Sequence, residues 1–354
     1  MKHLLLLAFG FGLATGASAA NWPQFRGPES RGVASGPNLP DRWSATENVA
    51  WKTDVPGRGW SSPIVWGDRV FLTTAVNSGE LEPPKKGLYF GGNRPEPRNV
   101  QLDCKVLCLD LPSGKKLWER SVHQGPSKSP IHLKNSFASE TPATDGERVY
   151  ACFGNQGLYC LDLEGNPVWS KRFEPRATRN GWGTAASPVL HGERIYVVND
   201  NEEESFLIAL DKKTGNEIWR AVWPNDRGAG HASVVVSEVA GTRVYVNTTA
   251  GGALGVRAED GRLLWTYEID RTTAVIPTPI IRGDLVFFTA GYNRGGVIVR
   301  VGRVRGFVPA SQLSARWQAQ QDAEGDPEQR WARLVGQAIA RLAANLDHER
   351  VDLL

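Results

Sequence analysis

A phrase that ends in tryptophan recurs along the chain and constrains its fold more than any other feature. It reads VLCLDLPSGKKLW, LYCLDLEGNPVW, LIALDKKTGNEIW and LGVRAEDGRLLW, ending at Trp118, Trp169, Trp219 and Trp265. A glycine precedes each of these tryptophans at the same distance, and a shorter relative, ENVAWKTDV, contains Trp51. After a longer first step, successive tryptophans stand about 50 residues apart, which is typical of a repeat architecture.

A second phrase follows each tryptophan and completes the repeat unit. It reads SSPIVWGDRVFLTT, TPATDGERVYACFG, ASPVLHGERIYVVND and PTPIIRGDLVFFTA, with a looser copy VVVSEVAGTRVYVNTT. Segments such as VLCLD and RVYAC alternate with period two and are rich in β-formers, so they predict half-buried strands. The glycine-containing phrases between them predict tight turns. Each unit is therefore expected to be an antiparallel sheet of about four strands, and a series of such units predicts an all-β fold, the β-propeller, whose blades must stack to bury their faces.

The repeat assigns structural roles to its tryptophans and to two cysteines. Trp51, Trp118, Trp169, Trp219 and Trp265 are expected to wedge between neighbouring blades, where each buries on the order of 200 Å². Cys108 and Cys160 occupy the repeat position of Ala209, which asks only for a small apolar residue. Cys104 and Cys152 are less constrained, so a disulfide among the four cysteines stays open.

The phrase ALDKKTGNEIW (209–219) closely resembles the repeat of the pyrroloquinoline-quinone (PQQ) type β-propeller family. The resemblance covers residues 21–290, and the opening NWPQFRGP is similar to the start of exported bacterial members. About five blades can be recognised, a number that could close a ring, whereas members of this family usually have seven or eight. The sequence therefore leaves open whether the ring is complete or truncated.

The resemblance raises the question of catalysis. Quinoprotein dehydrogenases that share this repeat use an adjacent pair of cysteines, a calcium ion held by acidic and amide side chains, and an aspartate base. Here no two cysteines are adjacent, and the acidic run NDNEEES (199–205) is better interpreted as a solvated hairpin tip than as a calcium loop. We therefore predict no catalytic residue, no metal ligand and no cofactor. The alternative is a PQQ-dependent oxidoreductase with calcium, and the sequence does not decide whether the chain is an enzyme.

Members of the family without the catalytic set look like binding scaffolds, such as the propeller subunit of the outer-membrane β-barrel assembly machinery. The resemblance thus implies a non-catalytic protein that holds a protein or polymer on one propeller face. Trp60 in GRGWSS and Trp182 in RNGWGTAAS stand in glycine-rich loops and are candidate ligand contacts. Packing between blades is the other interpretation of both.

Residues 1–20, MKHLLLLAFGFGLATGASAA, predict a signal peptide with a basic start, a short apolar run and small residues before the cleavage point. The apolar run is too short for a lasting membrane anchor, and no transmembrane segment is expected in the mature chain. No cysteine stands near the cleavage point, so no lipid anchor is expected. The chain is predicted to be periplasmic or secreted. Its net charge of +3 is too small to predict binding to nucleic acid or an anionic membrane.

The repeat breaks off at GYNRGGVIVRVGRVRGFVPASQL (291–313). Residues 291–354 resemble the S-one RNA-binding domain, an OB-fold barrel, mainly through RGFVPASQL. The segment lacks a first strand of its own, and DPEQRWARLVGQAIARLAANL predicts a helix at about 327–345. Our hypothesis is a truncated exported propeller, residues 21–290, fused to a partial OB-fold-like tail. A divergent last blade is the alternative.

An OB-fold tail would imply contacts to RNA. Tyr292 and Phe307 would stack on bases, and Arg294, Arg300 and Arg305 would contact phosphates. Export of the chain argues against this function, because the signal peptide removes the tail from the compartment that holds messenger and ribosomal RNA.

Overall fold

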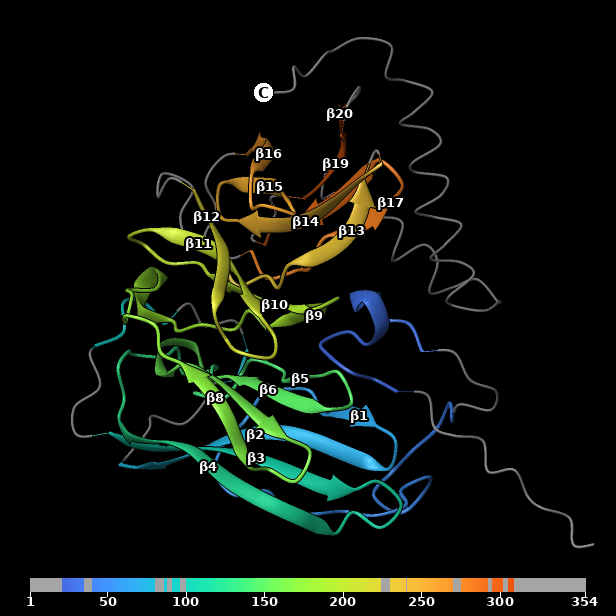
Figure 1. The fold of residues 1–354 in the computed structure, drawn as a ribbon, viewed down its shortest axis with the longest axis vertical. Coiled ribbons are helices and arrows are strands. Elements are labelled where there is room, and N and C mark those ends of the chain that lie inside the picture. Colours follow the sequence, from blue (N-terminus) through green and yellow to red (C-terminus); the bar gives the residue numbers. More distant parts are fainter. Residues whose placement is uncertain are drawn as a thin grey trace, which may run out of the picture.

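The computed structural model consists of five four-stranded antiparallel sheets that follow one another along the chain (Figure 1). It describes residues 21–34, 40–79, 86–87, 91–95, 100–223, 230–239, 241–269, 275–291, 295–301 and 305–308, the last of these by backbone alone. Each sheet is a meander whose strands lie in chain order. The predicted all-β architecture of four-stranded blades is confirmed.

The blades have the following strands. The first contains β1 (Ile64–Trp66), β2 (Arg69–Ser78), β3 (Gln101–Asp110) and β4 (Lys116–Pro126). The second contains β5 (Ala143–Thr144), β6 (Arg148–Cys152), β7 (Leu158–Asp162) and β8 (Pro167–Lys171). The third contains β9 (Val189–His191), β10 (Arg194–Asn199), β11 (Ser205–Asp211) and β12 (Glu217–Trp223). The fourth contains β13 (Val235–Val239), β14 (Thr242–Thr249), β15 (Gly252–Arg257) and β16 (Leu263–Glu268), and the fifth β17 (Ile280–Arg282), β18 (Leu285–Thr289), β19 (Gly296–Arg300) and β20 (Arg305–Val308). Three 3₁₀ turns complete the described elements: η1 (Pro28–Ser30), η2 (Gly154–Gln156) and η3 (Arg179–Gly181).

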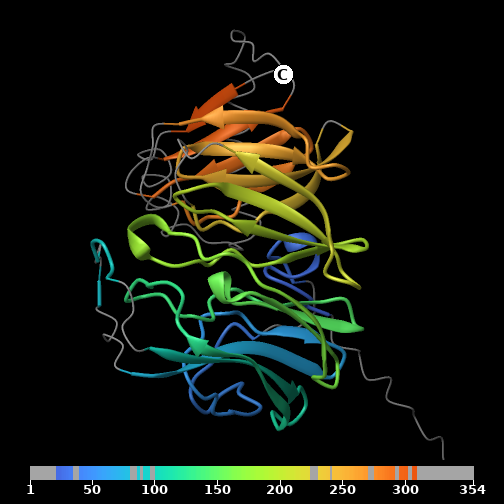
Figure 2. The ribbon, with the colours of Figure 1, turned by 60° about the vertical axis from the view of Figure 1, so that its left-hand side comes forward.

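The blades are arranged in chain order across the molecule. The first blade, in blue and teal, and the fifth, in orange and red, lie at opposite ends in both views (Figures 1 and 2). The first strand of each blade lies on the inner side, where β1, β5 and β9 contact one another in turn and β13 contacts β17. The described blades therefore form an arc of a propeller around a common axis.

The hydrophobic core lies between the blades rather than within any one of them. Phe71 of the first blade packs in one cluster with Val149 of the second. The rings of Tyr196 and Tyr245, from the third and fourth blades, pack at an interplanar angle of 35° with their centroids 3.9 Å apart. The last cluster joins Trp265 of the fourth blade to Phe288 of the fifth.

Burial patterns along the strands follow from this stacking. Strand β11, SFLIALD, is buried at every position but its last, because neighbouring blades cover both of its faces. The outermost strand of the same blade, β12, alternates between buried and exposed positions over most of its length. The segments VLCLD and RVYAC, predicted to be half-buried, lie in strands β3 and β6 inside their blades and are buried at every position but one. The prediction of half burial is wrong for them, because neighbouring blades cover both faces of these strands.

The break in the repeat falls inside the fifth blade. Strand β18 pairs with β19, and β19 pairs with β20, so the boundary at 290/291 separates the two inner strands from the two outer ones. The first part of the OB-like segment thus supplies half of a blade. The predicted helix at about 327–345 lies outside the described residues, and the division of the chain at 290/291 stays a prediction.

Candidate functional site

The blades have two faces that differ in their connections. We call the hairpin face the one that carries the turns from the first to the second strand and from the third to the fourth strand of each blade. The loop face carries the connections from the second to the third strand and from one blade to the next. Both faces hold candidate site residues, so they are described in turn.

On the hairpin face, four tryptophans each dock on the turn between the third and fourth strands of the following blade. The indole Nε1–H donates to a backbone oxygen there, in the pairs Trp51–Leu111 at 2.7 Å, Trp118–Leu163 at 2.9 Å, Trp169–Lys212 at 3.1 Å and Trp219–Ala258 at 3.3 Å. Each ring also lies on the glycine of that turn: a Cβ at Gly215 would stand 2.6 Å from Trp169. The repeat therefore links each blade to the next through one indole and one glycine.

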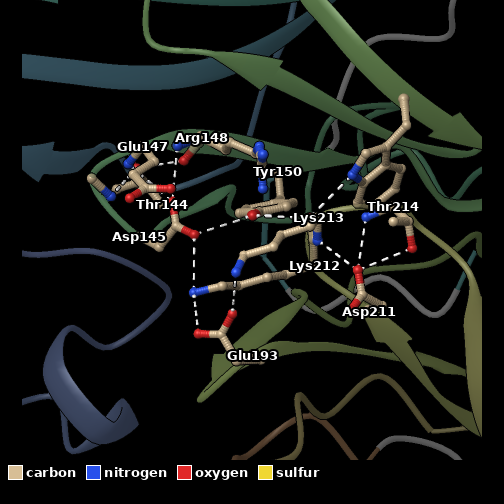
Figure 3. Close-up of polar contacts among 12 residues, drawn as sticks. Thr144, Asp145, Glu147, Arg148, Tyr150, Glu193, Asp211, Lys212, Lys213 and Thr214 are labelled. Carbon is tan, nitrogen blue, oxygen red and sulfur yellow. Dashed lines mark hydrogen bonds and ion pairs between the residues drawn. The ribbon is translucent and has the colours of Figure 1, made fainter.

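The docking of Trp169 is reinforced by charged side chains (Figure 3). Lys212, on the turn that receives Trp169, forms ion pairs with Asp145 at 3.3 Å and with Glu193 at 3.2 Å. The hydroxyl of Tyr150 donates to the Lys212 oxygen or the Asp145 carboxylate, each at 3.2 Å. Burial alone would raise the pKa of Asp145, but backbone N–H donors and the Lys212 charge hold it below its usual value.

The fifth step of this series is different. Trp265 is only 9% exposed and packs against the fifth blade, yet its Nε1–H has no hydrogen-bond partner among the described residues. Val301 stands where Leu111 stands in the first blade, since its N–H donates to Asp284 at 2.9 Å as that of Leu111 does to Asp68 at 2.8 Å. Val301 thus occupies the position equivalent to Leu111, but among the described residues the indole of Trp265 is not bonded to it.

A second series links the blades at the start of their inner strands. A backbone N–H of one blade donates to a hydroxyl of the next, in the steps Ser62 to Thr141 at 3.0 Å, Thr141 to Ser187 at 3.0 Å and Ser187 to Ser233 at 2.9 Å. These residues come from the serine- or threonine-containing phrase that precedes each inner strand. The first four blades are therefore joined on the loop side of the axis as well as on the hairpin face.

Residues 21–31, which we call the axial segment, run across the inner strands on the hairpin face (blue in Figure 1). Trp22 forms an antiparallel bridge with Val65 of the first blade, through N–H···O distances of 2.8 and 2.9 Å. The oxygen of Pro23 accepts from Thr144 of the second blade at 2.8 Å. The Oε1 of Gln24 accepts from Leu190 of the third at 2.9 Å, and η1 contacts β13 of the fourth. The opening phrase NWPQFRGP thus contacts four blades in succession.

A pocket of 680 Å³ lies between the axial segment and the inner strands of the last three blades. Apolar side chains from β9, β13 and β17 line it together with polar ones. Four arginines line the pocket against two glutamates: Arg26, Arg31, Arg243 and Arg282 against Glu29 and Glu238. Burial and the nearby Arg243 charge lower the pKa of His191, so this imidazole adds no charge at neutral pH. The fixed charge of the lining is therefore positive.

The arginines of the pocket differ in the hydrogen bonds and ion pairs that their guanidinium groups form. The guanidinium of Arg26 donates to the backbone oxygens of Ser30 at 3.2 Å and Arg31 at 3.3 Å, and Arg31 pairs with Glu29. Arg243 and Arg282, which also line the pocket, have no side-chain hydrogen bond or ion pair within the part of the chain that the structure describes. These two guanidiniums are the groups best able to bind an incoming anion.

On the loop face, the structure places the two predicted tryptophans in different surroundings. Trp60 is 53% exposed, and its backbone N–H donates to the oxygen of Ala138 at 3.0 Å. Trp182 is 8% exposed, its Nε1–H donates to the oxygen of Gly92 at 3.0 Å, and its ring meets His132 edge-on. Trp60 is therefore open to a partner, whereas Trp182 lies against the insertion between β2 and β3.

The loop face also holds two buried carboxyl groups that the sequence analysis missed. Glu140 accepts a hydrogen bond from the hydroxyl of Thr184 at 2.5 Å, and burial raises its pKa to about 7. Asp200 accepts from Ser205 at 2.7 Å and from the N–H of Gly230 at 2.6 Å, and burial raises its pKa to about 7. Each carboxyl bonds the segment that leads into the next blade.

A signal for these groups exists in the repeat. Glu140 precedes the threonine of its phrase at a position where the other blades have serine, alanine or proline. The run NDNEEES was interpreted as a solvated tip, which holds only for its glutamates: Asp200, Asn201 and Ser205 are buried. The polar residues flanking the glutamates bond to one another and close the loop.

The chemistry of cysteines and metals was also predicted from sequence. Cys104, Cys108, Cys152 and Cys160 are free, buried thiols, and burial raises the pKa of Cys108 to about 11. Across the described ranges, no three His, Cys, Asp or Glu side chains are placed to hold a metal ion. In the same ranges, no helix is long and apolar enough to cross a bilayer.

The predicted RNA contacts are only partly visible. Tyr292 and Arg294 lie outside the described residues. Arg300, at the end of β19, forms an ion pair with Asp284 at 3.1 Å. Arg305 and Phe307 belong to β20, which is described by its backbone. Binding of RNA by these residues stays a prediction.

Four-stranded blades around an axis, joined by a tryptophan in each repeat, define this chain as a β-propeller of the PQQ-type repeat class. A model of the family described as "Outer membrane protein assembly factor BamB" matches residues 103–335, and the chain belongs to this family. The predicted family resemblance is confirmed. The match also continues across residue 290 into the segment that resembles an OB-fold.

Individual relatives agree with this assignment. The chain is 24% identical over 285 residues to the outer membrane protein assembly factor BamB of Burkholderia pseudomallei (strain K96243), an alignment that covers 73% of this chain and 66% of the relative. The chain thus spans just under two thirds of that relative's length.

Two solved structures match the chain over most of its length. BamB from Moraxella catarrhalis matches with 16% identity and a TM-score of 0.48, over 75% of this chain and 68% of that one. Quinohemoprotein alcohol dehydrogenase from Comamonas testosteroni matches with 14% identity and a TM-score of 0.55, over 83% of this chain and 49% of that one. At this identity the second match supports the propeller fold and nothing finer.

Proposed function

We propose that the chain is an exported, non-catalytic scaffold that binds a protein partner on a propeller face. Membership of the assembly-factor family carries this proposal. The Burkholderia relative is named for the assembly of outer membrane proteins, which is work done by binding other proteins. The predicted signal peptide agrees with a location outside the cytoplasm.

The surface offers two places for such a partner. The pocket beside the axial segment combines apolar side chains with free guanidinium groups, and Trp60 projects from the loop face. Exposed tryptophan and arginine are the residue types that contribute most to protein interfaces. A propeller can present both without motion, because its loops are held by stacked blades.

Site-specific photo-crosslinking in the source cell tests the proposal. A photoreactive amino acid would replace Trp60 on the loop face or Ile280 in the pocket, with Leu117 on an outer strand as the control site. These side chains are 53%, 39% and 51% exposed, so all three can report contacts. We expect one defined envelope protein, identified by mass spectrometry, to crosslink from at least one face position and not from Leu117. The same adducts from all three positions, or none, would contradict a specific scaffold.

Two further measurements address export and catalysis. Cell fractionation should find the chain, without residues 1–20, in the periplasm or medium, and retention in the cytoplasm would contradict the proposal. The purified chain, incubated with PQQ and calcium, should oxidise no alcohol. Turnover that depends on added quinone would instead support the oxidoreductase alternative.

We also propose that the fifth blade is where an ancestral propeller was truncated and joined to another sequence. The unpaired Nε1–H of Trp265 supports this, because the docking bond is missing at the blade that contains the break. Tryptic digestion of the natural protein should give GDLVFFTAGYNR, which spans the break, and GFVPASQLSAR from the tail in one band. Blade peptides that continue beyond the printed sequence, without the tail peptide, would identify the joined sequence as an artefact.

A further inference from the structure

The pocket beside the axial segment has features that select one kind of ligand. We infer that it binds an extended peptide segment in which acidic and apolar residues alternate. This inference rests on the proposed scaffold function and names the chemistry of its partner. Three observations carry it: the charge of the lining, the free edges of the inner strands, and the apolar residues between them.

The charge of the lining favours an acidic ligand. Four arginines face the pocket against two glutamates, and Arg243 and Arg282 have no ion-pair partner among the described residues. Arg243 stands opposite Glu238 in the pairing of β13 with β14, yet the two side chains form no ion pair. A carboxylate entering the pocket would form charge-assisted hydrogen bonds with guanidinium groups that are otherwise unused.

The inner strands favour an extended chain. Among the described strands, β13 and β17 are each paired on one side only, with β14 and β18. An edge of this kind presents unpaired N–H and C=O groups to which an extended peptide can add. The axial segment already binds this way elsewhere on the axis, since Trp22 forms an antiparallel bridge with the inner edge of β1.

The apolar part of the lining sets the spacing of the ligand. Val189, Val235 and Val236 come from β9 and β13, and Ile280 and Ile281 come from β17. Ile280 is 39% exposed, which leaves apolar surface uncovered beside the arginines. Because side chains of an extended peptide alternate between two sides, apolar residues would contact these side chains while carboxylates reach the guanidiniums.

Fluorescence polarisation with a defined probe tests the inference. The probe is fluorescein-labelled Val-Glu-Val-Asp-Val-Glu amide, titrated with the full chain lacking residues 1–20. The double variant Arg243→Gln/Arg282→Gln should bind it at least tenfold more weakly. The matched control is Arg262→Gln, an exposed arginine on the outer turn of the fourth blade, which should leave the affinity unchanged. Equal affinities for the wild type and the double variant would overturn the inference.

Two modified probes separate the charge from the strand edge. Replacement of the acidic residues by lysine should abolish binding, and methylation of alternate backbone nitrogens should weaken it at least tenfold. If the methylated probe binds as well as the parent, or citrate displaces the parent at equal carboxylate concentration, the pocket binds small anions and the inference fails. Crosslinks from Trp60 would still support the scaffold after such a failure, so the two proposals can fail separately.

Discussion

The first four blades and the fifth differ in how they are joined to their neighbours. Each of the first four receives an indole hydrogen bond on the turn between its third and fourth strands. The fifth receives the ring of Trp265, buried to the same 9% exposure as Trp219, without the hydrogen bond. Packing therefore continues through the break in the repeat, whereas the specific polar contact does not.

This difference distinguishes two kinds of contact between blades: apolar packing, which the propeller needs throughout, and the indole hydrogen bond, which the repeat supplies. Burial of apolar surface between blades is non-directional and tolerates a changed sequence. A hydrogen bond needs a donor and an acceptor in fixed positions, so it is lost when a turn changes shape. In an array of stacked units, stability is approximately a sum of terms within and between neighbours, so one weakened interface can be compared with an intact one.

The prediction with the largest expected effect concerns the removal of one intact tryptophan contact between blades. Trp219→Ala should lower the free energy of unfolding by about 3–5 kcal/mol, because it opens a cavity between the third and fourth blades and removes the bond to Ala258. Denaturant unfolding followed by circular dichroism measures this change. Trp43→Ala, at a side chain 72% exposed, is the control and should change stability by less than about 0.5 kcal/mol. A loss below about 1 kcal/mol for Trp219→Ala would show that this indole does not join the blades.

The blades themselves could be predicted from sequence because their signals are local. Alternating apolar residues, turn glycines and a tryptophan at a fixed interval recur within each unit, so the phrases could be aligned without knowledge of the fold. The five four-stranded sheets follow from this pattern. The continuation of the fifth sheet through β19 and β20 was harder to predict from sequence, because RGFVPASQL resembles a different domain.

The candidate site could not be predicted in the same way because it depends on contacts between distant segments. The pocket needs the axial segment to lie against β13 and β17, more than 200 residues away in sequence. Trp60 and Trp182 stand in similar glycine-rich loops. They differ in exposure because the insertion between β2 and β3 covers Trp182. Glu140 was detectable as a charge at a repeat position that is uncharged elsewhere, a signal weaker than the tryptophan pattern.

The second test concerns the loop-face contacts of the early blades. Glu140 bonds the lead-in to the third blade and has a folded-state pKa raised to about 7 from 4.5. A raised carboxyl pKa means that the folded state binds a proton more tightly than the unfolded state. The stability this contributes is complete below the ordinary pKa and is lost as pH rises through about 7.

We therefore expect Glu140→Gln to remove part of the pH dependence of stability. Between pH values of about 4 and 8 the variant should lose roughly 3 kcal/mol less than the wild type, since glutamine stays neutral. Denaturant unfolding at a series of pH values provides the comparison. Glu47→Gln, at an exposed side chain, should follow the wild-type profile. Parallel profiles for Glu140→Gln and the wild type would show that folding does not change the pKa of this carboxyl.

The third test asks whether the glycine of the docking turn is needed for the indole. Gly215 has a φ of 73°, and an added Cβ would meet the Trp169 ring at 2.6 Å. Gly192, in a hairpin turn of the same blade, has a φ of 59° with nothing within 4 Å. Both alanine variants carry the cost of a left-handed residue, so Gly215→Ala should be less stable than Gly192→Ala by about 2 kcal/mol. Equal losses of stability would mean that the Trp169 indole moves away from the added Cβ without cost. The close contact between this indole and the turn would then not join the blades.

The smallest and most direct test compares the two matched tryptophans. Phenylalanine at either position retains an aromatic ring and removes the Nε1–H. At Trp219 this breaks the bond to Ala258, whereas at Trp265 it removes a buried donor that was unpaired. Trp219→Phe should therefore cost about 1 kcal/mol more than Trp265→Phe, the usual net value of one hydrogen bond. Each change is measured as a shift of the denaturant midpoint at constant slope, so that altered unfolded states do not enter the difference.

If the two variants lose the same stability, then the indole hydrogen bond contributes nothing to the contact between blades. The fifth blade would in that case be held as firmly as the other four, and the break in the repeat would not weaken the interface between the fourth and fifth blades.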